Sequence, residues 1–148
     1  MKILIETVAH SAQRYDTCGD WTVSPEGNWT IKVSSLHNWR HELLIAIHEL
    51  VEMTLCRDKE ITAKEVDDFD IDYQRKLEHL AQCNNGTVCR DADHEELRVE
   101  TSAEEPGDSV NAPYYKQHQI ASAVERLLAA EMKVDWLAYS DQVDNLKY

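Results

Sequence analysis

The pentapeptide His48-Glu49-Leu50-Val51-Glu52 holds the residue types of a metal centre. His48 and Glu52 are four residues apart, so a helix would turn both toward one side, where they can bind a single ion. Glu49 lies on the adjoining edge of that turn, like the general base of an HExxH helix, which takes a proton from water that the metal activates. Imidazole nitrogen and carboxylate oxygen together suit zinc. The pattern predicts a zinc-dependent hydrolase with Glu49 as its base.

A third ligand has to come from another part of the chain. His118 lies on the apolar side of a helix predicted over residues 114–132, and it could complete the set with His48 and Glu52. Histidines and carboxylates on buried helix faces must be paired, because an unpaired buried charge costs several kcal/mol. A hydrogen-bond network without chemistry would satisfy the same demand, and both interpretations stay open at this point.

Two further acidic residues border the predicted site. Glu125 is two turns beyond His118, and three roles are open to it: a fourth ligand, an outer partner of His118, or a charge at the rim beside Arg126. Asp70 borders the apolar stripe of the preceding helix. It is either an extra ligand, a group that orients a metal-bound histidine, or a carboxylate hydrogen-bonded at a helix boundary.

The elements that must position these residues follow from periodicity. A strand is predicted over residues 2–8, and a hairpin over residues 20–24 and 28–33, with turn residues between its arms. The central helix spans residues 38–56, on an apolar stripe of Leu44, Ile47, His48, Val51 and Leu55. A capping box at Thr62 and Glu65 opens the next helix, which runs to about Ala81, and a short last helix covers residues 135–146. We expect an α+β fold with a short N-terminal antiparallel sheet packed on three to four helices.

Length and composition set the wider limits. The 148 residues, 43% of them hydrophobic, predict one domain over residues 1–148, with a long acidic loop over residues 82–112. Residues 91–108 hold eight acidic side chains against one Arg. The net charge of −13 argues against direct binding to nucleic acid, which needs surplus Lys and Arg.

The sequence has no apolar run of about 20 residues and no signal peptide, so we expect a cytoplasmic protein. Four cysteines without a CxxC pair predict reduced thiols.

The hairpin and the His-Glu-x-x-Glu helix resemble a minimal zincin metallopeptidase. The resemblance implies that His48 and Glu52 bind zinc, that Glu49 is the base, and that the strand Trp29–Ser34 pairs with an extended substrate. The last motif position departs from the family, because Glu52 stands where the family also uses His. The segments GDWTV, AIHELVEMTLC, EPGD, APYYKQHQIASAVERLL and VDWLAY are similar to a family of small phage and prophage proteins of mostly unassigned role.

Two other functions remain open besides a hydrolase of peptides or small molecules. A phage origin implies a factor that acts on a host pathway, so an acidic protein that binds and inhibits a host defence or nucleic-acid enzyme is one alternative. The other is a nucleotide pyrophosphohydrolase resembling the all-helical MazG-like class, in which Glu49, Glu52 and Asp70 would hold magnesium. The predicted hairpin argues against that all-helical class.

Overall fold

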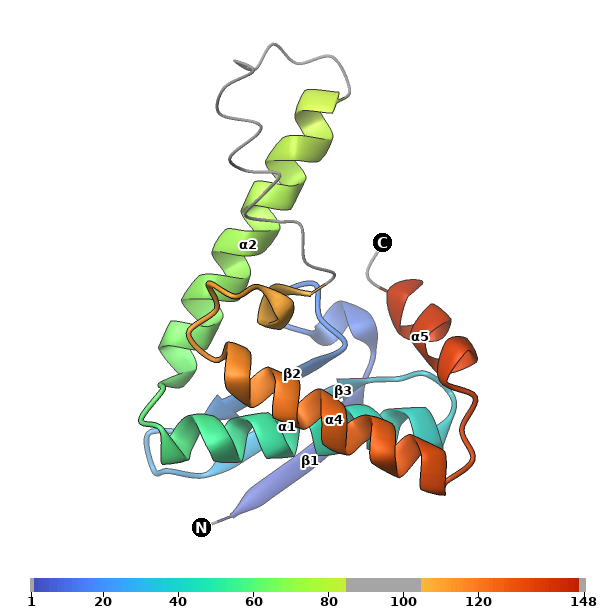
Figure 1. Cartoon of the computed structure of the whole chain (residues 1–148). Helices are drawn as coiled ribbons and strands as arrows, with labels where there is room; N and C mark the ends of the chain where they lie inside the picture. The colour runs from blue at the N-terminus through green and yellow to red at the C-terminus, as the bar shows by residue number, and fades with distance from the viewer. Residues whose placement is uncertain (1, 85–104, 147–148) are drawn as a thin grey trace.

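A three-stranded sheet forms one side of the molecule in the computed structural model, which describes residues 2–84 and 105–146 (Figure 1). Its strands are β1 (Ile3–Val8), β2 (Gly19–Val23) and β3 (Trp29–Ser34), in the order β1-β3-β2. The predicted hairpin is confirmed, since β2 and β3 pair antiparallel. The sheet is mixed rather than antiparallel throughout, because β1 runs parallel to β3. The chain passes through a short 3-10 turn, η1 (His10–Ala12), to the far edge of the sheet, and β3 then fills the place between the other two strands.

The central position of β3 corrects one expectation about the substrate. Both edges of Trp29–Ser34 are occupied, one by β1 and the other by β2. A strand pairs with an extended peptide only through a free edge, where its backbone groups are unpaired. The strand that precedes the central helix therefore cannot bind a substrate by strand pairing.

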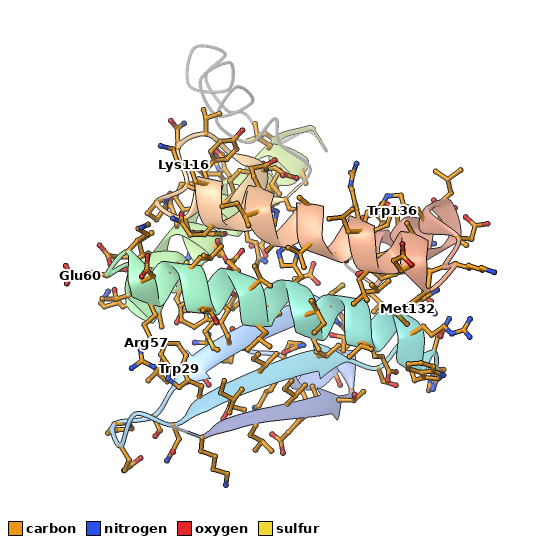
Figure 2. The ribbon with its side chains drawn as sticks, turned by 60° about the horizontal axis from the view of Figure 1, so that its bottom comes forward. Trp29, Arg57, Glu60, Lys116, Met132 and Trp136 are labelled. Carbon is orange, nitrogen blue, oxygen red and sulfur yellow. The ribbon has the colours of Figure 1, made fainter. Side chains whose placement is uncertain are left out.

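Helix α1 (Trp39–Asp58) lies between the sheet and helix α4 (Tyr115–Glu131), which gives the molecule three layers (Figure 2). The Asn38 side chain caps α1 by accepting a hydrogen bond from the Arg40 amide at 3.1 Å. Figure 2 shows Glu60, just past the end of α1, on the same side as Lys116 near the start of α4, so the two helices run antiparallel. The residues of α1 that face α4 are thus brought opposite residues of α4 in reverse order.

Burial on two sides changes the stripe predicted for α1. Ile47, Val51 and Leu55 are only half-buried, whereas Ile45 and Met53 are buried. The apolar residues of a helix covered by one partner form a single stripe, but α1 has the sheet on one side and α4 on the other. Leu44 and His48 of the predicted stripe are buried as expected.

The remaining helices frame this core. Helix α2 (Ala63–Asn84) begins at the predicted capping box, in which the Glu65 carboxylate accepts from the Thr62 amide at 2.8 Å. Helix α5 (Trp136–Asp144) and the 3-10 turn η2 (Pro106–Asp108) follow later in the chain. The α+β class is confirmed. Of the acidic loop predicted over residues 82–112, residues 85–104 lie outside the described part of the chain.

The cysteines differ in part from the prediction. Cys18 and Cys56 are free thiols, but Cys83, in the last turn of α2, is disulfide-bonded. Spacing along the sequence did not reveal this, because disulfides depend on the distance between Cβ atoms in the fold. Within residues 2–84 and 105–146, no helix has the length and apolar character to cross a membrane.

Candidate metal centre

The antiparallel packing of α1 on α4 brings His48, Glu52 and His118 together. His48 Nε2 lies 3.2 Å from His118 Nδ1, and Glu52 Oε2 lies 3.0 Å from His118 Nδ1. The third separation, from His48 Nε2 to Glu52 Oε2, is 3.6 Å. All three side chains are buried, with 5–9% of each residue exposed. The three residues singled out by sequence therefore converge at one point between the helices.

These separations fit a tetrahedral ion. Zinc bonds of 2.0–2.1 Å place neighbouring ligand atoms about 3.3–3.4 Å apart in a tetrahedron. The observed values of 3.0, 3.2 and 3.6 Å scatter around that edge length. Two imidazole nitrogens and one carboxylate oxygen are also a donor set of catalytic zinc sites, which keep a fourth position for water or substrate. His48, Glu52 and His118 could therefore hold a metal ion, and their donor types are ones that zinc accepts.

Glu125 orients His48 and is not placed as a ligand. Its Oε2 lies 2.9 Å from His48 Nδ1, the ring nitrogen that points away from the other two candidate ligands. Its Oε1 accepts a hydrogen bond from the Tyr139 hydroxyl of α5. A carboxylate on the outer nitrogen of a histidine fixes the tautomer and makes the inner nitrogen a better metal ligand. Of the three roles left open for Glu125, the partner role holds, but the histidine it contacts is His48 rather than His118.

Trp21 orients Glu52 through a hydrogen bond, which the sequence did not predict. Trp21 packs on Trp29, with ring centroids 5.9 Å apart. Its indole Nε1 also donates to Glu52 Oε1 at 3.2 Å. The other oxygen, Oε2, is thereby left facing the two histidines. No periodicity signal distinguishes a packing tryptophan from one that donates a hydrogen bond.

Replacing Trp21 with Phe is expected to weaken zinc binding by about 10–100-fold, which is typical when an outer hydrogen bond to a ligand is lost. The indole donor disappears, while most of the aromatic packing remains. Trp29→Phe is the matched control, since Trp29 is a buried tryptophan on the neighbouring strand. The dissociation constants would be measured by competition with a chromophoric chelator. Equal zinc affinities for the two variants would show that the Trp21 hydrogen bond does not support the site.

Glu49 lies beside the three candidate ligands and contacts β2. Glu49 is half-buried, so it is more accessible than the three candidate ligands, which are buried. A Cβ atom on Gly19 would come within 2.4 Å of Glu49 Oε1, so the absence of a side chain at Gly19 makes room for this carboxylate. Within the part of the chain that the structure describes, the Glu49 carboxylate accepts no hydrogen bond. Glu52 of the same turn is held by hydrogen bonds, whereas the Glu49 carboxylate is not held by any among the described residues.

The cluster shifts the pKa of its members in opposite directions. Burial alone would lower the pKa of His48, but hydrogen bonds with Glu125 and Glu52 outweigh burial and raise that pKa well above 6.5. Burial would raise the pKa of Glu52, but its hydrogen bonds with His118 and His48 lower that pKa to about 2. Burial and the nearby charge of Glu52 raise the pKa of Glu49 well above 4.5. Glu52 is thus held as the anion that a cation requires.

Asp70 lies outside the group of ligands. Its Oδ2 accepts from the Tyr15 hydroxyl at 3.2 Å, and its Oδ1 accepts from the Tyr114 hydroxyl. The Tyr114 ring meets the His118 ring edge-on, with centroids 6.3 Å apart, so it stands between Asp70 and the histidine. Asp70 neither ligates with His48 and His118 nor hydrogen-bonds to them. Of the roles considered for Asp70, the structure supports that of a carboxylate held by hydrogen bonds.

The titration of Asp70 is expected to make folding stability depend on pH. Burial raises the pKa of Asp70 from 3.8 to about 7, although the Tyr114 hydrogen bond opposes the shift. A carboxyl whose pKa is raised in the folded state stabilises the fold fully below about pH 4, and that contribution is lost as the pH rises through about 7. As the pH is lowered from 8 to 5.5, the stability of the wild-type chain should therefore increase relative to that of Asp70→Asn. Thermal unfolding of both proteins at each pH checks this, and a constant difference in Tm would contradict it.

Comparison of the chain with protein-family models, with curated proteins and with solved structures gave no match.

Proposed function

We propose that this protein is a metal-dependent hydrolase of the zincin-like type, with zinc held by His48, Glu52 and His118 and with Glu49 as general base. The observation that carries the proposal is the convergence of three donor atoms at 3.0, 3.2 and 3.6 Å, a spacing that suits tetrahedral zinc. When bound, zinc supplies Lewis acidity and activates water at neutral pH. The surrounding side chains orient the ligands and transfer the proton.

Two of the three candidate ligands have their orientation fixed by a second group. Glu125 holds His48 by the ring nitrogen that faces away from the ion, and Trp21 holds the outer oxygen of Glu52. These outer contacts leave His48 Nε2 and Glu52 Oε2 beside His118 Nδ1, so that three possible ligand atoms lie within reach of one ion.

Glu49 supplies the base in this proposal. It neighbours His48 in the sequence and lies in the same helical turn as Glu52, yet its carboxylate is not tied up by a hydrogen bond among the described residues. It is also less buried than the three candidate ligands. A carboxylate in that position can remove a proton from the attacking water and deliver it to the leaving group. The expected substrate is a peptide or a small molecule with a hydrolysable bond, such as an amide or a phosphate ester.

The proposal is tested by hydrolysis of a mixed fluorogenic peptide library, with small amides and phosphate esters assayed in parallel. Protein stripped by a chelator should be inactive, and stoichiometric zinc should restore activity. His48→Ala, purified identically, controls for a contaminating hydrolase. Zinc-loaded wild-type protein that hydrolyses none of these compounds would overturn the proposal.

The pyrophosphohydrolase alternative has less support. It requires Glu49, Glu52 and Asp70 to hold magnesium together, but Asp70 is occupied by Tyr15 and Tyr114. It also requires an all-helical fold, whereas this chain has a three-stranded sheet. An acidic protein that inhibits a host enzyme stays a prediction, because most of residues 91–108 lie outside the described part of the chain. In that case Glu49→Gln would leave biological activity unchanged.

A further inference from the structure

His118 presents its second ring nitrogen to another pair of carboxylates. While Nδ1 faces His48 and Glu52, Nε2 lies 3.6 Å from Glu105 Oε2 and 3.6 Å from Asp108 Oδ1. These three atoms also lie within 4.8 Å of one another. His118 is 5% exposed, whereas the side chains of Glu105 and Asp108 are 36% and 35% exposed. The imidazole therefore has a buried inner side and an outer side that solvent can reach.

The turn η2 is built closely against this imidazole. Glu105 precedes the turn and Asp108 ends it, so both carboxylates flank Pro106 and Gly107. A Cβ atom on Gly107 would come within 2.5 Å of His118 Cγ and Nδ1, which only glycine avoids. Gln119 Nε2 donates to Asp108 Oδ1 at 2.7 Å and steadies that carboxylate. The segment EPGD, singled out in the sequence, thus places two acidic groups on one ring nitrogen.

His118 Nε2 faces two carboxylates without a hydrogen bond to either. An N–H donates to a carboxylate oxygen at about 2.7–3.2 Å, so 3.6 Å is too long for either contact, and among the described residues His118 Nε2 makes no hydrogen bond. This buried nitrogen and the two carboxylate oxygens lie within 4.8 Å of one another, close enough to share one metal ion. We propose that Glu105, Asp108 and His118 Nε2 bind a second divalent ion. Two carboxylates and one imidazole suit manganese or zinc.

The surrounding charge supports the same conclusion. Glu49, Glu52, Asp108 and Glu125 gather around two imidazoles, and none of these four forms an ion pair with Lys or Arg among residues 2–84 and 105–146. Buried carboxylates without a nearby cation are costly, and bound metal ions commonly supply the missing charge.

With both ions bound, His118 joins them through its two ring nitrogens. A neutral imidazole carries one ring proton, and metal coordination requires each ligand atom to be deprotonated. Binding of the outer ion therefore displaces the remaining ring proton of His118 to solvent. This role goes beyond the proposed hydrolysis and does not depend on it, because the outer site is defined by occupancy alone.

The test is equilibrium dialysis against zinc alone, followed by elemental analysis of the protein. Wild-type protein should bind about two ions per chain, Glu105→Gln with Asp108→Asn about one, His48→Ala about one, and His118→Ala none. The amide variants keep the shape of the side chains and remove only their charge. Asp58→Asn with Glu60→Gln is the matched control, since both residues are exposed in α1 and just after it. It should still bind two ions.

The ion counts of these proteins separate the outer site from the inner one. A wild-type count of one that is unchanged by the amide variants but lost in His48→Ala would overturn the outer site and leave the inner one intact. A single ion lost in the amide variants and kept in His48→Ala would support the outer site and refute the zinc centre of the proposed function. Circular dichroism of each variant, measured without metal, excludes loss of the fold as the cause.

Discussion

Glu49→Gln should reduce hydrolysis by the zinc-loaded protein by about 10²–10⁴-fold, the range that a positioned general base contributes. Glutamine has the shape of glutamate and fits the same space beside Gly19, but its amide cannot take a proton. Trp21 and Glu125 hold Glu52 and His48 and do not touch the substituted group, so the ligands should keep their positions. The loss is therefore expected in kcat, with zinc content unchanged.

The measurement pairs turnover with elemental analysis on the same protein sample. Glu131→Gln is the control, because Glu131 is an exposed residue at the end of α4 and makes the same change of charge. It should leave turnover and zinc content unchanged. Full turnover in Glu49→Gln would remove Glu49 from the mechanism, even if zinc-dependent hydrolysis itself were established.

His48→Ala should abolish the stabilisation that zinc gives to the fold. A ligand present at 1,000 times its dissociation constant stabilises the folded state by about 4 kcal/mol. For a chain of this size that corresponds to an increase in Tm of roughly 8–16 °C, at 2–4 °C per kcal/mol. Removing His48 takes away one of three ligands and leaves the Glu125 carboxylate without its partner at 2.9 Å. The variant should show little or no increase in Tm from the inner ion.

Thermal unfolding is measured with and without zinc in a background of Glu105→Gln and Asp108→Asn, so that only the inner site responds. His37→Ala is the control, because His37 is an exposed histidine outside the cluster. Its zinc response should equal that of the background protein. If the increase in Tm survived His48→Ala, the stabilising ion would have to bind elsewhere.

The sequence predicted which residues meet at the candidate centre because their signal is local. His48, Glu49 and Glu52 lie in one turn of a strongly periodic helix, and His118 shares the apolar side of another. Burial then limits the number of arrangements in which such groups can be paired. The hairpin, the capping box and the boundaries of α1 and α4 were also read from short-range patterns, and the structure agrees with them within a few residues.

What the sequence did not reveal depends on packing between distant segments. Periodicity cannot show that β1 lies beside β3 instead of β2, because strand order is set by pairing between segments that are distant in the sequence. It did not reveal the hydrogen bond from Trp21 to Glu52, and it left Glu125 with three roles. The turn holding Glu105 and Asp108 was read as part of an acidic loop, since nothing local marks Gly107 as the point of contact with His118.

The span of the cluster along the chain has a consequence for the order of folding. Its contacts join residues 66, 70 and 77 positions apart, with all of α2 lying between them. Closing loops of this length costs entropy that no ligand pair within a single helix turn can repay. Zinc met early in folding would find only His48 and Glu52, a weak two-ligand site. We therefore expect the ion to bind late in folding, after α4 has docked on α1. Zinc binding would then follow formation of the core and would not nucleate it.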